Sequence, residues 1–448
     1  MKKIVSALFL PLFLSASNDP LTLNEALEIL KNNNLEIKAA SLEVKSAQED
    51  IDKTSGLNWG KLDFTQDVAR SNDAGNVFGF KLTSREANFG DFGFADFSLT
   101  NPNILNVQPH DLNYPEDRDF FQSKLKYELP IFTGFAISSY TTIMKEVKNI
   151  KSLDKEKTLN EKVFQLKKSY YDMALLESSI INMQKILSNI NALENTTKTM
   201  IDVGYAKKVD LLEVQAKKGN VKRLLVQMKA NEELLYHYIS FLLNEKVEKI
   251  ELPTSEITQP NFTDEDVLNR NLDIQKASTA LEIKESMLDA SQASYYPTVG
   301  AFAEVSTADN TFLGNASDHK AYTVGARLTW NIFNGGIDNA KVEKAKIEQL
   351  KMQSQVQLAK KGISLKLAKI KTEIKSANQE IKSLKKELDL ANAIYANYEG
   401  RYKEKLVSMN DVIIKQSSQI EKILQLLVAK NKRNEKIFEL EKLANGEK

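Results

Sequence analysis

The stretch that decides the fold is SKLKYELPIFTGF, residues 123–135. As far as Ile131 its apolar side chains alternate with polar or charged ones, which is the period of a β-strand with one apolar face. After Gly134 the chain contains no proline until Pro253, and apolar residues recur every three or four positions, as in a helix. The sequence therefore predicts a short amphipathic strand that leads directly into a very long helix.

The same joint occurs a second time, in GARLTWNIFNGG, residues 325–336. Two further pairs of segments keep the same order along the chain. The segment that begins at Leu21 resembles the one that begins at Asn261. GYAKKVDLLEVQ, from Gly204, corresponds to KLVSMNDVIIKQ, from Lys405. Three matches in one order indicate a duplicated structural unit.

Each repeat is expected to contain a helix, two strands and a long helical hairpin. We expect the first repeat at 18–245, a linker at 246–262, the second repeat at 263–443 and a tail at 444–448. In the first repeat we expect a helix at 22–55, strands at about 60–70 and 120–132, and a hairpin at 136–245. In the second we expect a helix at 263–294, strands at about 298–307 and 321–333, and a hairpin at 337–443. The additional residues of the first repeat, 71–118, predict a long exposed loop between its strands.

The hairpins have the heptad pattern of a coiled coil. From Ile363 to Tyr402 the apolar residues alternate steps of four and three, which requires a partner helix. The runs 136–200 and 337–397 could each reach roughly 90 Å at 1.5 Å per residue. Helices of that length are typical of a column or a tube rather than of a globular domain.

The predicted strands have one apolar and one polar face, with tyrosine and tryptophan near their ends, a pattern typical of transmembrane β-strands. In the last strand, for example, Val324 and Leu328 alternate with Thr323 and Arg327. The aromatic residues expected at the membrane boundary are Tyr127, Tyr322 and Trp330. A soluble sheet packed on a core is the alternative, but the apolar faces of the neighbouring helices already pair with one another. Four strands cannot close a barrel, so several copies must share one, and three copies would supply twelve strands.

The N-terminus, MKKIVSALFLPLFLSAS, combines two lysines, an apolar stretch and small residues, which predicts a signal peptide at 1–17. No later segment is long and apolar enough for a membrane-spanning helix, so a membrane-embedded protein would have to cross as strands. The net charge of +1 gives no electrostatic basis for a nucleic-acid partner, and none is expected. The absence of cysteine excludes disulfides, thiolate catalysis and cysteine metal sites.

With these features the sequence resembles the TolC-like outer-membrane efflux protein family, the outer membrane factors. The resemblance rests on LTLNEALEILKNNNLEIKAA, from Leu21, on the two strand-to-helix joints, and on DVGYAKKVDLL and KLVSMNDVI, from Asp202 and Lys405. It implies a mainly α fold with a small transmembrane β part. In that fold three copies form a 12-stranded β-barrel in the outer membrane, which continues into an α-helical barrel in the periplasm.

The resemblance also implies that the two hairpin tips form the periplasmic mouth and bind an adaptor protein. The adaptor-binding residues would be Asp202, Val203, Gly204, Tyr205, Ala206, Leu406, Val407, Ser408 and Met409. The second tip departs from the family in having Lys405 where glycine is expected, although glycine tolerates left-handed backbone angles that lysine resists.

A periplasmic gate is implied at the same tips. Asp411 corresponds to the first of two gate aspartates in the family's model member, whereas Ile414 replaces the second. Asp210 is the counterpart of Asp411 in the first repeat. The alternative for both aspartates is that each stabilises the start of a helix.

No catalytic or cofactor motif accompanies these features, because the sequence contains neither HExxH nor a Walker-type loop. We therefore expect no enzyme activity, no cofactor and no metal site. His110 and His319 lie in predicted loops between strands, where plain solvation and a loose external metal site are the two interpretations.

The resemblance implies a trimeric outer-membrane channel-tunnel, the passive exit duct of a tripartite efflux pump or a type I secretion system. Its partners would be two further copies, a periplasmic adaptor, an inner-membrane pump and outer-membrane lipid. It would be located in the outer membrane, with its helical tunnel in the periplasm. The alternative function is that of a periplasmic adaptor in an export system.

Overall fold

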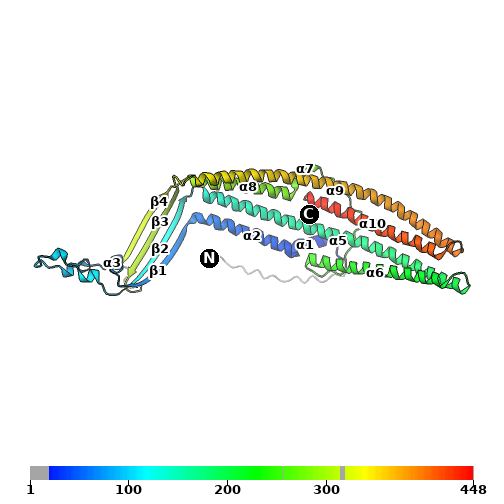
Figure 1. The fold of residues 1–448 in the computed structure, drawn as a ribbon, viewed down its shortest axis with the longest axis horizontal. Coiled ribbons are helices and arrows are strands. Elements are labelled where there is room, and N and C mark those ends of the chain that lie inside the picture. Colours follow the sequence, from blue (N-terminus) through cyan, green and yellow to red (C-terminus); the bar gives the residue numbers. More distant parts are fainter. Residues whose placement is uncertain (1–19, 255, 313–317, 447–448) are drawn as a thin grey trace. The chain divides into compact units, whose positions relative to one another are not determined.

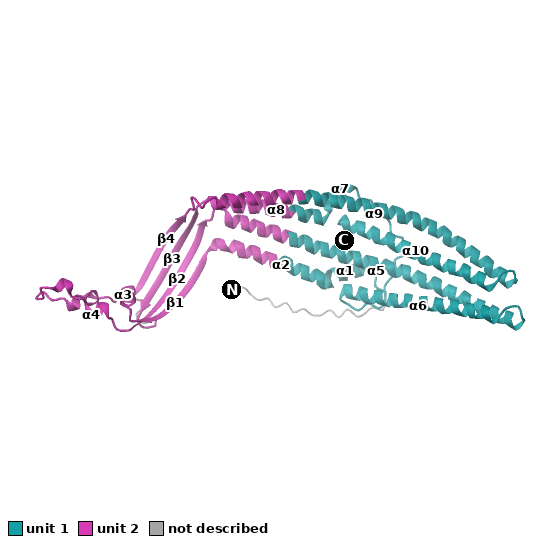
Figure 2. Cartoon of the chain, in the orientation of Figure 1, with its two compact units in different colours: residues 1–44, 150–278, 355–448 teal, residues 45–149, 279–354 magenta. Residues whose placement is uncertain are grey.

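The structure, a computed structural model, describes residues 20–254, 256–312 and 318–446. The predicted signal peptide, 1–17, and the end of the predicted tail lie outside the described residues. The chain forms two compact units (Figure 2). Unit 1 comprises residues 1–44, 150–278 and 355–448, and unit 2 comprises residues 45–149 and 279–354.

Unit 2 contains a four-stranded antiparallel sheet in the order β1-β2-β3-β4 (Figure 1). The strands are β1 (Lys61–Ser71), β2 (Arg118–Phe132), β3 (Thr298–Asp309) and β4 (Lys320–Thr329). The last strand ends earlier than the expected range of 321–333. The reason is that β3 begins only at Thr298, after Pro297, and Thr298 pairs with Thr329. Residues after Thr329 therefore have no residue of β3 to pair with.

The pairing register places apolar and polar residues on opposite faces of this sheet. Two neighbouring rows on one face are Leu62, Tyr127, Ala303 and Val324, and Phe64, Leu125, Val305 and Tyr322. The row between them, on the other face, is Asp63, Lys126, Glu304 and Thr323. The apolar face is exposed in the chain, with 67% of Phe64 and 82% of Tyr322 accessible to solvent. The predicted alternation is therefore present in the folded sheet.

The insert between β1 and β2, expected as a long loop at 71–118, contains short helices. They are α3 (Ala74–Thr83), α4 (His110–Asn113) and 3-10 turns at Phe89–Phe92, Phe94–Asp96 and Ile104–Asn106. Phe80 of α3 stacks on Phe120 of β2 with the ring centroids 4.1 Å apart. This stacking anchors the insert to the sheet.

Glycines stand at both joints between the sheet and the long helices. Gly134 has a φ of +62°, and a Cβ at this position would lie 2.6 Å from the carbonyl oxygen of Ala293. The position therefore requires glycine. At the second joint Gly335 and Gly336 have φ values of +71° and +83°. The helices that follow the joints are α5 (Ala136–Asp202) and α9 (Ile337–Lys403).

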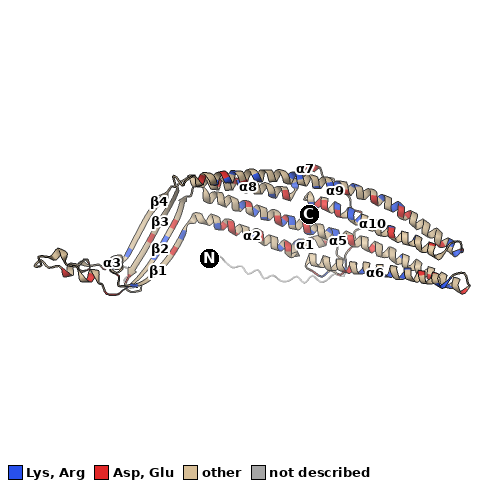
Figure 3. Ribbon diagram, viewed as in Figure 1, with Lys and Arg blue, Asp and Glu red and all other residues tan. Residues whose placement is uncertain are grey.

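The two hairpins consist of α5 with α6 (Lys208–Leu243), and of α9 with α10 (Met409–Leu443). The predicted heptad positions are buried, since Leu367, Ile370 and Ile374 are at most 2% exposed. Acidic and basic residues are interspersed along the helices without a block of one sign (Figure 3), which agrees with the small net charge. In the described part of the chain no helix has both the length and the apolar character needed to span a membrane.

Asparagines interrupt both of the helices expected at the starts of the repeats. The helix expected at 22–55 is divided into α1 (Leu23–Asn33) and α2 (Leu35–Gly56), and the one expected at 263–294 is divided into α7 (Asp264–Arg270) and α8 (Leu272–Gln292). Asn34 Oδ1 accepts the backbone N–H groups of Glu36 and Ile37 at 3.0 and 3.1 Å. Its Nδ2 donates to the carbonyl of Leu242, near the end of α6, at 2.8 Å.

Asn271 repeats this arrangement in the second repeat. Its Oδ1 accepts the N–H groups of Asp273 and Ile274 at 3.1 and 3.2 Å, and its Nδ2 donates to the carbonyl of Leu443 at 2.9 Å. Each asparagine thus starts one helix and satisfies a carbonyl at the end of another. The prediction of continuous helices was wrong at these two positions because the apolar period continues through both of them.

Candidate functional site: the two hairpin tips

The turn of the first hairpin is closed by a glycine. The helix α5 ends at Asp202, and Gly204 has a φ of +76°. The N–H of Tyr205 donates to the carbonyl of Met200 at 2.8 Å, and the N–H of Gly204 donates to the carbonyl of Ile201 at 3.0 Å. This pair of hydrogen bonds is the Schellman motif that commonly ends a helix.

The turn of the second hairpin has the same geometry with a lysine. Lys405 has a φ of +66°, and its N–H donates to the carbonyl of Tyr402 at 2.9 Å. The N–H of Leu406 donates to the carbonyl of Arg401 at 2.9 Å. The lysine, which stands where the first tip has Gly204, therefore leaves the turn geometry unchanged, although a left-handed lysine costs roughly 1–2 kcal/mol of backbone energy. The Lys405 ammonium lies over the ring of Tyr205, in the other tip.

Both candidate gate aspartates cap the helices that follow the turns. Ser408 and Asp411 form a complete capping box at the start of α10. The Ser408 hydroxyl and N–H donate to Asp411 Oδ2 at 2.6 and 3.1 Å, and the Asp411 N–H donates to Ser408 Oγ at 3.2 Å. These bonds from the Ser408 hydroxyl and backbone lower the pKa of Asp411. At the start of α6 only half of the box exists, because Asp210 accepts the Lys207 N–H at 2.7 Å and a lysine side chain cannot accept in return.

The predicted adaptor-binding residues differ in their exposure. Tyr205 and Leu406 are 65% and 67% exposed, and Val203 is similarly open to solvent. Asp202, Gly204 and Ser408 are exposed as well, whereas Ala206 and Val407 are half-buried. Met409 is only 1% exposed and belongs to the apolar core beneath the tips. We therefore correct the assignment of Met409 to an adaptor-binding surface, because its side chain is buried in this core and does not face solvent.

Polar contacts join the two hairpins below the tips. The buried hydroxyls of Thr197, in α5, and Tyr402, in α9, are 3.4 Å apart. The ammonium of Lys217, in α6, donates to the hydroxyl of Ser417, in α10, at 2.6 Å. The sequence predicts Tyr402 as a heptad position. It does not predict Thr197 as its partner, because a heptad pattern does not specify which helix packs against it.

A second polar group beneath the first tip was missed by the sequence analysis. Glu194 lies 2.8 Å from Lys218, in α6, and 2.9 Å from Lys198, within α5. Hydrogen bonds from Lys218 and then from Lys198 lower the pKa of Glu194 to about 2. The contact with Lys218 joins the two arms of the first hairpin.

Two of the three aromatic residues expected at the membrane boundary donate to backbone carbonyls. The Tyr127 hydroxyl donates to Trp59 at 2.6 Å, and Trp330 Nε1 donates to Tyr295 at 3.2 Å. Trp330 directly follows the end of β4, whereas Tyr127 and Tyr322 lie on neighbouring rows of the apolar face. An aromatic ring with an anchored polar tip is the kind of side chain found at membrane interfaces.

One group of potential metal ligands occurs among the described residues. The ligand atoms of Glu86, Asp309 and His319 lie within 4.8 Å of one another. The guanidinium of Arg118 contacts Glu86, so one of the two carboxylates already has a cationic partner. His110 is not part of this group, and its ring nitrogen lies 3.1 Å from Asp111 instead. The arrangement supports an ion-pair cluster rather than a metal centre.

Part of the chain matches a known protein family. Residues 265–446 match the family model described as outer membrane efflux protein. No curated protein sequence matches the chain at a significant level. This match covers most of the second repeat and agrees with the expected resemblance to outer-membrane channel proteins.

Solved structures share the fold over nearly the whole chain. The channel protein CusC superposes with a TM-score of 0.78 at 15% identity, covering 95% of this chain and 92% of its own. The outer membrane protein VceC from Vibrio cholerae has a TM-score of 0.76 at 14% identity, covering 95% and 96%. The MtrE outer membrane channel of Neisseria gonorrhoeae, in its open state, has a TM-score of 0.74 at 15% identity, covering 95% and 89%. The family match over the second repeat and the fold shared over nearly the whole chain both agree with the resemblance to the TolC-like outer-membrane efflux proteins.

Proposed function

We propose that three copies of this chain form a passive exit duct that runs from the periplasm to the cell exterior. The observation that carries this proposal is the sheet, which has one exposed apolar face and one charged face. Its two edge strands, β1 and β4, have no outer neighbours among the residues that the structure describes. Open edges and unpaired backbone groups are not stable in lipid. Three such sheets, joined edge to edge, would close a barrel of twelve strands.

The polar face of the sheet supports a water-filled interior. Lys126 pairs with Glu128 at 2.5 Å along β2, and Lys124 pairs with Glu304 of β3 at 3.6 Å. Charges of both signs on one face, opposite a face of Leu, Phe, Val and Tyr, are the alternation expected of a lipid-facing exterior and a hydrated interior.

The hairpins supply the periplasmic tunnel in this proposal. The helices α5 and α9 have 67 residues each, so each is about 100 Å long at 1.5 Å per residue. The duct would catalyse nothing, and an inner-membrane pump would provide the energy. A periplasmic adaptor would bind the exposed tip residues, chiefly Val203, Tyr205 and Leu406, and its binding would shift the hairpins between two packings. Asp411 and Asp210, which cap the helices at the mouth, would form the gate.

The proposal is tested by placing a charge on each face of β4 in turn. Val324 is 73% exposed on the apolar face, and Thr323 is its neighbour on the polar face. Val324→Asp is expected to impair insertion into the outer membrane, since a charge in the lipid-facing band is destabilising, by about 2–4 kcal/mol for a basic residue at mid-depth and by less for an acidic one. Thr323→Asp, the matched control, is expected to leave trimers and conductance in planar bilayers intact.

Fractionation provides the second part of this test. The wild-type protein is expected to stay with the outer membrane after alkaline washing and to crosslink as a trimer. Release into the wash, or equal effects of Val324→Asp and Thr323→Asp, would refute the duct and would favour the alternative of a periplasmic adaptor.

A further inference from the structure

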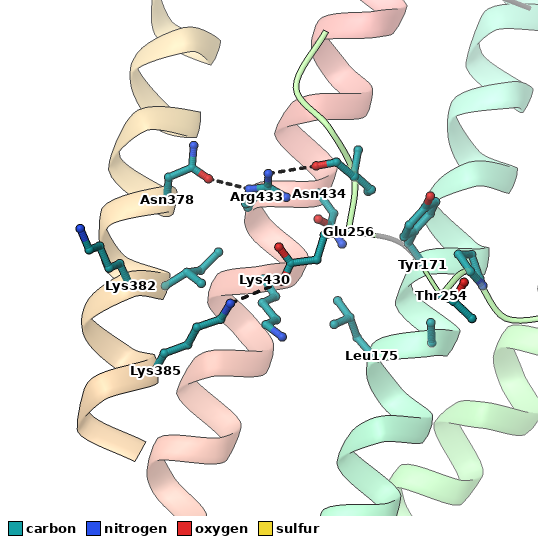
Figure 4. A pocket seen from close by; sticks show the side chains of 14 residues that line it. Tyr171, Leu175, Thr254, Glu256, Asn378, Lys382, Lys385, Lys430, Arg433 and Asn434 are labelled. Carbon is teal, nitrogen blue, oxygen red and sulfur yellow. Dashed lines mark hydrogen bonds and ion pairs between the residues drawn. The ribbon is translucent and has the colours of Figure 1, made fainter. Parts of the chain in front are cut away.

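A cavity of about 400 Å³ lies in unit 1, between α5, α9, α10 and the linker residues 253–254 and 256–257 (Figure 4). Its apolar wall includes Leu175 of α5, Ile257 of the linker and Ile381 of α9. The volume is within the range of small-molecule sites in proteins. Because the walls come from segments that are far apart in the sequence, the cavity exists only in the folded chain.

The polar side of the cavity carries an excess of positive charge. Lys385, Lys430 and Arg433 line it together with one carboxylate, that of Glu256. Glu256 lies 3.4 Å from Lys385, so these two charges balance each other. Lys430 forms no ion pair with any residue that the structure describes. Lys382 also borders the cavity, but Figure 4 shows its side chain extending away from the others.

The guanidinium of Arg433 is fixed in the wall by neutral partners. Its Nε donates to Asn378 Oδ1 at 2.6 Å, and its Nη2 donates to the carbonyl of Ile257 at 3.0 Å. Both bonds are visible in Figure 4. An amide and a carbonyl orient the guanidinium but do not neutralise it, so Arg433 and Lys430 leave two uncompensated positive charges beside an apolar wall.

We propose that this cavity binds an amphiphilic organic anion, a molecule with a carboxylate or phosphate head and a short apolar tail. The head pairs with Lys430 and Arg433, and the tail packs against Leu175, Ile257 and Ile381. An anion here relieves the repulsion between the two cations, and charge-assisted hydrogen bonds are among the strongest available to a ligand. The bound molecule touches α5 of the first hairpin as well as α9 and α10 of the second.

The first experiment measures binding of a dansyl-labelled undecanoic acid to the full-length protein in nanodiscs of zwitterionic lipid. We expect saturable binding with one molecule per chain, and about tenfold weaker binding of the methyl ester, which lacks the charge. Inorganic phosphate is expected not to displace the fatty acid at equal concentration, because it has no tail. Equal affinity for the ester, or displacement by phosphate alone, would overturn the assignment of an amphiphilic anion.

The second experiment locates the binding site. Lys430→Gln is expected to weaken binding about tenfold, and Lys430→Arg to retain it. Lys432→Gln removes an equal charge from an exposed position of α10 that does not line the cavity, and it is expected to bind as the wild type does. Wild-type affinity in Lys430→Gln would refute the proposed site. Since the measurement is of binding and not of export, its failure would leave the proposed duct untouched.

Discussion

The ammonium of Lys405 lies 3.3 Å from the centre of the Tyr205 ring, so the turn of the second hairpin is held against the turn of the first. Glycine at position 405 would suit the left-handed backbone better. Lysine is less stable than glycine in this backbone conformation, but it forms a cation–π contact between the hairpins that glycine cannot form. Lys405, where the first tip has Gly204, therefore connects the two tips.

Removing either partner of this contact is expected to let the tips separate more readily. For Lys405→Gly and for Tyr205→Leu we expect the open probability of purified trimers in planar bilayers to rise about 2- to 5-fold, the equivalent of 0.5–1 kcal/mol. The double variant should exceed neither single variant, because both changes remove the same contact. Lys403→Ala serves as the control, since its ammonium pairs with Glu399 within α9. Additive effects in the double variant would contradict the contact.

The capping and gating roles of Asp411 can be separated by changing one partner at a time. Asp411→Asn removes the charge, whereas Ser408→Ala keeps the charge and removes the hydroxyl that completes the capping box. If Asp411 is a gate, only Asp411→Asn should relieve block of the channel by divalent cations. Ser408→Ala should instead destabilise the start of α10 by about 1 kcal/mol.

The measurement combines single-channel recordings with hydrogen exchange at the start of α10. Ser364→Ala, in the middle of α9, controls for the loss of a serine hydroxyl. Unchanged cation block in Asp411→Asn would discard Asp411 as a gate and leave it as a helix cap. Because the pKa of Asp411 is lowered in the folded chain, its contribution to stability is present at neutral pH and is lost as the pH falls through the folded-state value.

Asn34 is expected to matter more for stability than its exposed neighbour Asn32. Asn34→Ala removes the cap of α2 and leaves the Leu242 carbonyl without its donor, which should cost about 2 kcal/mol. Asn32 donates only to Glu28, one turn earlier in the same helix, so Asn32→Ala should change stability by less than about 0.5 kcal/mol. Thermal unfolding followed by far-UV circular dichroism compares the two variants. Equal melting temperatures would show that the interruption at Asn34 is not stabilised by its long-range bond.

Glu194 is expected to make the first hairpin sensitive to acid. Its carboxyl ordinarily titrates near 4.5, and Lys218 and Lys198 lower its pKa to about 2 in the fold. The unfolded chain therefore takes up this proton first, so the stabilisation is complete above pH 4.5 and is lost as the pH falls towards 2. Glu194→Gln should be less stable at neutral pH and should show a shallower loss of stability over this range. The control is Glu421→Gln, which changes an exposed glutamate of α10. If Glu194→Gln has the same pH profile of stability as the wild type, Glu194 is not the source of the acid sensitivity.

The sequence by itself determined the features that depend on local order along the chain. The alternation around Phe64 and Tyr322 predicts a sheet with two unlike faces, since successive side chains of a strand point to opposite sides. The heptad run that contains Leu367 predicts the buried side of α9, and the paired motifs predict where both hairpins turn. Each of these follows from residues a few positions apart.

The tertiary structure alone decided which distant segments meet. The interruption at Asn34 depends on the Leu242 carbonyl, and the burial of Met409 depends on the helices that surround it. Likewise, the cation–π contact of Lys405 depends on Tyr205, which lies on the other hairpin. The physical reason is that periodicity in the sequence specifies which side of a helix or strand is apolar or polar. It does not specify which residue of another segment packs against that side, and the contact energy depends on that partner residue.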